Sequence, residues 1–193
     1  AGATWVKVCV SEGEGGLTPG ASHESKNSAF GLGLDNLYYF IDWNDYGIDD
    51  RPASSVINGS PEEWFAPYGW NVYHAGDGSA WEPLRDAFEQ IFSATPAGRP
   101  HMLFFKTRKG REYLVYDNKS HGAAHAMNSE LFWKTTEPFA EKYGVTFEGC
   151  REAAPDTADG IKEQCLKNLQ AVTNVLTSDD ELLEYLANRL VEI

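Results

Sequence analysis

The chain has 193 residues, of which 42% are apolar and 13% aromatic, and a formal net charge of −13. This composition is typical of one globular domain with an appendage. The negative charge argues against nucleic-acid or anionic-membrane partners, because both attract basic surfaces.

No apolar run approaches the roughly 20 residues that cross a bilayer, and we recognise no secretion signal. The cysteines number three, an odd count that favours a reducing compartment. We therefore expect a cytoplasmic protein with no membrane partner. The sequence opens almost directly on a predicted strand and lacks an initiator Met, so we also expect a partial chain.

Two apolar segments near the start, Trp5–Val10 and Leu37–Asp42, predict strands. An acidic glycine turn, Ser11-Glu12-Gly13-Glu14, follows the first, and Asn44 lies just after the second. In an open parallel sheet, ligands bind beyond the carboxyl ends of the strands. The two tips are roughly 30 residues apart, about one βαβ unit, so we expect them to lie side by side. Their carboxylate, amide and carbonyl oxygens suit Mg²⁺.

Further along, Trp70–Tyr73 and His101–Lys106 predict two more strands, and capping sequences predict helices that begin near Ser60, Ser79 and Ser129. This alternation predicts an α/β fold with a doubly wound parallel sheet.

Gly76-Asp77-Gly78, a second glycine-flanked acid, is interpreted as an ordinary turn, because no asparagine follows it at the required spacing. The pattern changes after Gly144, where a polar linker precedes two amphipathic helices; the second of these is expected to begin with a cap at Ser178. We expect an α/β domain over residues 1–145, and a linker with a helical pair that leads towards a further domain over residues 146–193.

Taken together, these segments resemble the thiamine-diphosphate signature of the transketolase family. The matching segments, in the family's order, are Ser11-Glu12-Gly13-Glu14, Ile41-Asp42-Trp43-Asn44, Tyr68-Gly69-Trp70-Asn71-Val72, Lys106-Thr107-Arg108-Lys109-Gly110 and Ser120-His121-Gly122. The resemblance implies the diphosphate-binding domain of that fold. It also implies metal ligation by Glu12, Asn44 and the carbonyl of Tyr46. Gly13, Glu14, Asn44, Tyr46 and His121 would contact the cofactor, with His121 as the catalytic residue.

The activity that the resemblance implies is ketol transfer between sugar phosphates, with thiamine diphosphate and Mg²⁺ (or Ca²⁺). The cofactor carries the carbanion chemistry, and His121 hydrogen-bonds the developing alkoxide or moves its proton. In this family a glutamate from a separate pyrimidine-binding domain completes the site across a dimer interface. Nothing in this chain resembles that domain, so we expect such a domain or subunit as partner, in a homo- or heterodimer, and no activity from the isolated chain.

Two other interpretations remain open. A thiamine-dependent 2-oxo acid dehydrogenase component shares the fold and much of the signature. A non-catalytic domain that retains the fold is suggested by two departures: Glu12 stands where the family has aspartate, and Pro19 where it has glutamate.

Overall fold

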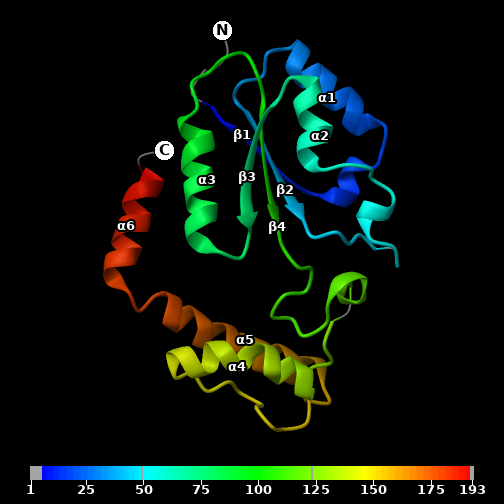
Figure 1. Cartoon of the computed structure of the whole chain (residues 1–193). Helices are drawn as coiled ribbons and strands as arrows, with labels where there is room; N and C mark the ends of the chain where they lie inside the picture. The colour runs from blue at the N-terminus through cyan, green and yellow to red at the C-terminus, as the bar shows by residue number, and fades with distance from the viewer. Residues whose placement is uncertain (1–5, 49, 123, 192–193) are drawn as a thin grey trace. The chain divides into compact units, whose positions relative to one another are not determined.

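The computed structural model of the protein describes residues 6–48, 50–122 and 124–191. Trp5, at which the first predicted strand starts, lies outside the described residues. The chain divides into two compact units, Ala1–Ala123 and Ala124–Ile193 (Figure 1). The domain boundary at residues 145/146 stays a prediction.

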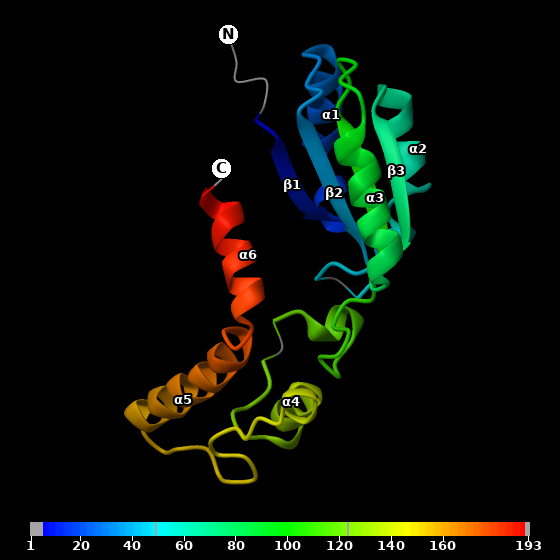
Figure 2. The same ribbon diagram turned by 90° about the vertical axis from the view of Figure 1, so that its left-hand side faces the viewer.

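The first unit is built on a parallel sheet, which confirms the predicted α/β class. Its strands are β1 (Val8–Gly13), β2 (Leu37–Trp43), β3 (Asn71–Asp77) and β4 (His101–Lys106). The sheet order is β1-β2-β4-β3, with β1 at one edge (Figure 2). The connecting helices are α1 (Ala21–Gly31), α2 (Pro61–Phe65) and α3 (Trp81–Ser93), with short 3₁₀ turns η1 (Glu14–Leu17), η2 (Ala53–Ser55), η3 (Ala66–Tyr68) and η4 (Asp117–Ser120).

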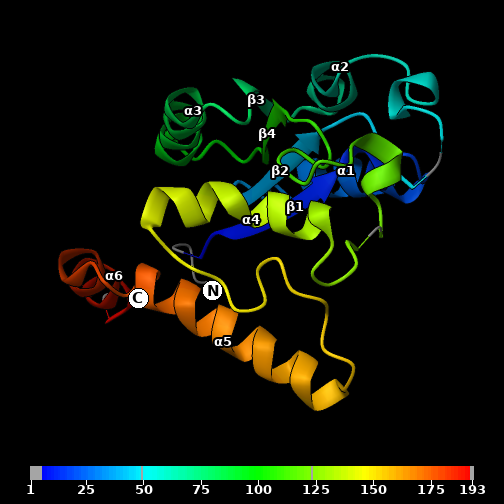
Figure 3. The same ribbon diagram turned by 90° about the horizontal axis from the view of Figure 1, so that it is seen from below.

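Apolar side chains cover both faces of the central strands. Ile41 on β2 packs with Met102 on β4 in one cluster, whereas Leu103, the next residue along β4, packs with the α3 side chain of Ile91 in the other. Successive side chains of a strand point to opposite faces, so a strand covered on both sides is apolar throughout. Figure 3 accordingly shows α3 on one side of the sheet and α1 and α2 on the other.

Two strands extend further towards their carboxyl ends than expected. β1, expected over Trp5–Val10, begins at Val8 and ends at Gly13, and β3, expected over Trp70–Tyr73, ends at Asp77. β1 continues through Glu12 and Gly13, which pair with Ile41 and Asp42 of β2, so the expected turn starts only at Glu14. The prediction of an ordinary turn at Gly76-Asp77-Gly78 is wrong for its first two residues. They end β3, where the register against β4 shifts between His74 and Asp77, and Gly76 accommodates this irregularity with φ +74°.

The helix caps are partly as predicted. Ser60 forms a full capping box with Glu63 at the start of α2, and Ser129 caps the helix that begins at Glu130. The cap predicted at Ser79 is wrong, because the Ser79 amide and hydroxyl both bind the Asp77 carboxylate, and Ala80 is the N-cap of α3.

The second unit contains α4 (Glu130–Tyr143), α5 (Ala158–Leu176) and α6 (Asp180–Val191). The side chains of Asn128, before α4, and Gln164, on α5, exchange two hydrogen bonds of 2.7 and 3.3 Å. The cap predicted at Ser178 is replaced by Asp179, whose carboxylate accepts the Leu182 amide at 2.9 Å. Over the part of the chain that the structure describes, no helix has the length and apolarity needed to cross a membrane.

Candidate functional site

Two strand tips meet at the carboxyl edge of the sheet through a buried carboxylate. Glu14, the first residue after β1, is only 1% exposed. Its Oε2 accepts the backbone amide of Asn44, the first residue after β2, at 3.0 Å. An acid at the end of one strand therefore fixes the backbone at the end of its neighbour, as expected for adjacent parallel strands.

The loop after β2 is ordered by its own polar side chains. Asn44 Oδ1 accepts the Tyr46 amide at 3.1 Å, and Asn44 Nδ2 donates to Asp42 Oδ2 at 3.3 Å. The other Asp42 oxygen accepts the Thr107 hydroxyl, which lies just after β4. Asp45, with φ +69°, binds both the amide and the hydroxyl of Ser54. These contacts give Asn44 one defined orientation.

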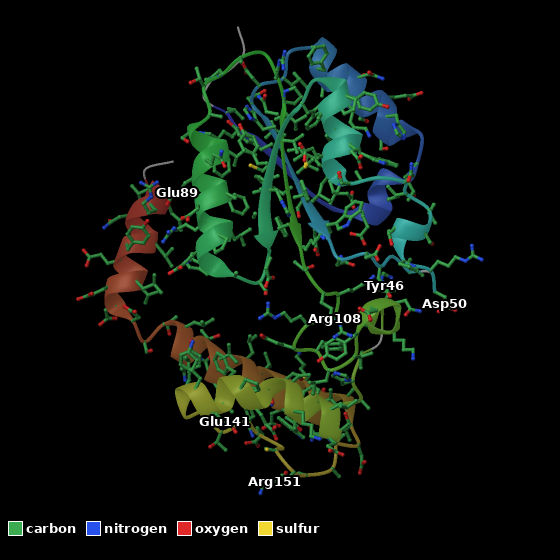
Figure 4. All side chains as sticks on the ribbon, viewed as in Figure 1. Tyr46, Asp50, Glu89, Arg108, Glu141 and Arg151 are labelled. Atoms are coloured by element: carbon green, nitrogen blue, oxygen red, sulfur yellow. The ribbon has the colours of Figure 1, made fainter. Side chains whose placement is uncertain are left out.

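One ammonium group joins the loop after β2 to the loop after β4. Lys109 Nζ donates to the carbonyl oxygens of Tyr46 and Gly47 at 3.0 and 2.8 Å, and lies 3.3 Å from His121 Nδ1. Figure 4 shows Tyr46 and Arg108, the neighbour of Lys109, on the loops beyond the strand ends. Lys109 therefore connects the predicted metal-binding carbonyl of Tyr46 to the predicted catalytic residue.

A cavity of about 670 Å³ opens beside these loops, within the first unit. Glu12 and His121 both line it, together with Gly15, Thr18, Gly47 and Arg51. The Glu12 side chain folds over Gly16, where a Cβ atom would lie 2.6 Å from Glu12 Cγ. Glycine at position 16 thus leaves room for this carboxylate at the cavity wall.

The structure thus brings most of the predicted site residues to one edge of the sheet. Glu14 contacts Asn44, Asn44 contacts Tyr46, and Tyr46 is linked to His121 through Lys109. Glu12 instead binds the amide of its neighbour Gly13 at 3.1 Å, and among the described residues no hydrogen bond joins it to Asn44 or Tyr46.

Sequence reasoning gave no role to Asp42, Thr107 or Lys109. Thr107 and Lys109 belong to the segment Lys106–Gly110, which carried part of the family resemblance. Their position in the sequence could have indicated a role. Thr107 and Lys109 follow a predicted strand, so their side chains are expected at the same edge of the sheet as the other strand tips.

The donor atoms fit a hard divalent cation. Glu12, Asn44 and Tyr46 offer a carboxylate, an amide and a carbonyl oxygen, the ligands that Mg²⁺ and Ca²⁺ prefer. The Tyr46 carbonyl oxygen has two lone pairs, and the Lys109 ammonium uses one of them. Within the described ranges, no cluster of three or more His, Cys, Asp or Glu side chains could hold a metal.

The environment of Glu14 shifts its pKa. Burial raises the pKa of Glu14, and the charges of Asp42 and Asp45 add to the increase, although hydrogen bonds from backbone amides oppose it. Burial is the largest of these causes, so the site disfavours the charged form of the carboxylate that holds the Asn44 backbone.

The raised pKa of Glu14 predicts a pH-dependent stability. Because the folded pKa lies above the roughly 4.3 of an unfolded glutamate, protonation stabilises the fold below that value, and this stabilisation is lost as the pH rises through the folded pKa. Glutamine keeps an acceptor for Asn44 without ionising. We expect Glu14→Gln to be more stable than the wild-type chain at neutral pH, with an advantage that shrinks towards about pH 4.

Urea unfolding across this pH range checks the Glu14 prediction. Glu24→Gln, at an exposed position of α1, is the matched control for removal of a carboxylate. A stability difference between Glu14→Gln and wild type that does not change with pH would contradict the role of burial.

Comparison with known proteins adds an independent observation. The family model described as transketolase, thiamine diphosphate binding domain, matches residues 4–172. Transketolase 2 of Xanthobacter flavus is 39% identical over 99 residues, which are 51% of this chain and 14% of that protein. Transketolase 1 of Pasteurella multocida is 34% identical over 95 residues, or 49% of this chain and 14% of that protein. The chain thus spans only a small part of these relatives' length.

Solved structures show the same fold. A transketolase from Campylobacter jejuni superposes with a TM-score of 0.58 at 20% identity, covering 93% of this chain and 28% of that chain. A transketolase from Leishmania mexicana superposes with a TM-score of 0.58 at 19% identity, covering 96% of this chain and 26% of that chain. At these identities the likeness shows the fold alone.

Proposed function

Because the chain belongs to the transketolase family, through its thiamine diphosphate binding domain, we propose that it is the diphosphate-binding part of an enzyme that transfers a ketol unit between sugar phosphates. The observation that carries this proposal is the linked set of strand tips. Glu14 joins the tip of β1 to Asn44, and Lys109 joins Tyr46 to His121. These loops are where an open parallel sheet binds its ligands.

In this proposal Glu12, Asn44 and the Tyr46 carbonyl would hold Mg²⁺ (or Ca²⁺), the kind of ion that keeps phosphate ligands. Gly13 and Glu14, at the end of β1 and the start of η1, place backbone amides beside that group. Thiamine diphosphate, when bound, supplies the carbon that accepts the ketol unit. The protein's own contribution is to bind, orient and hydrogen-bond.

His121 is the proposed catalytic residue. It is exposed at the wall of the cavity that Glu12 also lines, so its imidazole is accessible to a substrate oxygen. An imidazole at this place hydrogen-bonds an oxygen as negative charge develops on it. The proposal thus assigns His121 to the substrate and Asn44 to the metal.

We propose that a pyrimidine-binding domain or subunit completes the site, in a homo- or heterodimer, and that the protein works in the cytoplasm. By the family resemblance, the acid that activates the cofactor would come from that partner. The isolated chain is therefore expected to transfer no ketol unit between pentose phosphates. Turnover by the purified 193-residue chain would refute this expectation.

Calorimetry tests the proposed function. Thiamine diphosphate is titrated into the chain with and without Mg²⁺, and again with a pyrimidine-domain partner. The expected result is binding that requires Mg²⁺ and strengthens with the partner. If no binding occurs even with both present, the non-catalytic interpretation, motivated by Glu12 and Pro19, would replace this one.

A 2-oxo acid dehydrogenase component is the second candidate, since it shares the signature. Assaying the completed protein with pentose phosphates, and separately with pyruvate and an electron acceptor, separates the two. We expect turnover of the pentose phosphates only; turnover of pyruvate alone would identify the dehydrogenase.

A further inference from the structure

Lys109 uses all of its donors at the candidate site. An ammonium group has three N–H donors and no acceptor. Here it faces three acceptors, the carbonyl oxygens of Tyr46 and Gly47 and the ring nitrogen Nδ1 of His121, at 2.8 to 3.3 Å. The two carbonyls belong to the loop after β2, and His121 to the loop after β4.

The hydrogen bond between Lys109 and His121 can run in only one direction. Because the ammonium group can only donate, Nδ1 of His121 must accept, and a neutral imidazole then carries its proton on Nε2. We propose that Lys109 is a positioning residue that fixes His121 as the Nε2–H tautomer. This inference rests on the proposed function, because it assigns a use to the proton on His121.

Both partners of this contact are held from elsewhere. The bonds to the Tyr46 and Gly47 carbonyls fix the ammonium end of Lys109, and its own carbonyl oxygen accepts the Asp117 amide at 3.0 Å. The His121 amide binds the Asn118 carbonyl at 3.2 Å. The backbone of both residues is therefore held by hydrogen bonds of its own, and these bonds bring the ammonium group to the ring nitrogen.

The chemical consequence is that the two ring nitrogens of His121 have different roles, one as acceptor and one as donor. While Nδ1 accepts from Lys109, its lone pair is occupied and cannot take up a proton. Nε2 is then a donor, available to hydrogen-bond a substrate oxygen as negative charge develops there. His121 therefore works through one nitrogen, and Lys109 determines which one.

Nitrogen-15 NMR of the imidazole groups in the full chain tests the tautomer directly. Spectra are recorded near pH 8, where an ordinary imidazole is neutral, and His121→Gln identifies the signals. Lys109→Met removes the donors at similar chain length, Lys109→Arg keeps a charged donor, and Lys106→Met, at the exposed last residue of β4, is the control.

We expect the Nε2–H tautomer alone in the wild type, Lys106→Met and Lys109→Arg, and in Lys109→Met a shift towards the mixture of tautomers that an unconstrained imidazole adopts. An Nδ1–H signature in the wild type would overturn the inference, whatever the variants do. So would a wild-type signature in Lys109→Met. Failure of the proposed function is a separate result, since it appears as absence of cofactor binding in calorimetry while the tautomer is unchanged.

Discussion

Asn44→Ala is expected to abolish the Mg²⁺-dependent binding of thiamine diphosphate. Asn44 is the proposed metal ligand at the tip of β2, and its side chain also bonds the Tyr46 amide and Asp42. Even residues that only support a metal ligand are worth about 10–100-fold in metal affinity, so removal of a ligand should cost at least that much. Calorimetric titration with cofactor and Mg²⁺ measures the loss.

Asn44→Asp is the matched control, because it keeps an oxygen for Tyr46 and supplies a harder ligand to the metal. We expect it to retain Mg²⁺-dependent binding. Equal affinities of wild type and Asn44→Ala, with both folded by circular dichroism, would remove Asn44 from the metal site.

The second large effect is expected from Gly110→Ala, just after Lys109. Gly110 has φ +77°, and a Cβ atom there would collide with the Val115 carbonyl oxygen and lie 2.8 Å from Ser120 Cβ. A left-handed backbone alone costs an alanine about 1 kcal/mol, and the collision with backbone adds to it. We expect a loss of about 3 kcal/mol or more in the free energy of unfolding, measured by urea unfolding.

Gly76→Ala separates the two contributions to that loss. Gly76 has nearly the same φ, +74°, but a Cβ atom there meets no described atom within 4 Å. We expect this variant to lose only about 1 kcal/mol. Equal losses in the two variants would show that the collision with Val115 is relieved by the loop.

The sheet and the edge at which its strand tips meet could be predicted from the sequence, because each strand is marked by a local run of residues. His101–Lys106 is an apolar run with the observed bounds of β4, and Leu37–Asp42 falls one residue short of β2. Strand ends in a parallel sheet share an edge, so the position of Asn44 beside Glu14 followed from the order of the elements.

The loop after β4 could not be predicted in the same way. Its course depends on Glu112, Leu114 and Asp117, which adopt φ of +62°, +63° and +60°, values that non-glycine residues rarely take. Only the surrounding contacts determine such a backbone. The approach of Lys109 to Tyr46 and His121 depends on this path, and no periodic pattern in the sequence encodes it.

The end of β1 was wrongly predicted for a related reason. Ser11, Glu12 and Gly13 have weak strand propensity, yet pairing with Phe40, Ile41 and Asp42 of β2 keeps them extended. Tertiary pairing here overrides local preference. The position of the Glu12 side chain depends instead on Gly16, because a glycine there leaves room for the Glu12 carboxylate.

Paramagnetic broadening by Mn²⁺, a substitute for Mg²⁺, tests the location of the site most directly. Mn²⁺ with thiamine diphosphate is titrated into the ¹⁵N-labelled chain. We expect the backbone amides of Gly13, Asn44 and Tyr46 to broaden first. Glu89, in the half of α3 that lies away from the strand tips (Figure 4), is expected to keep its signal. First broadening at Glu89 or at other surface acids, or none at all, would contradict a metal site at the tips of β1 and β2.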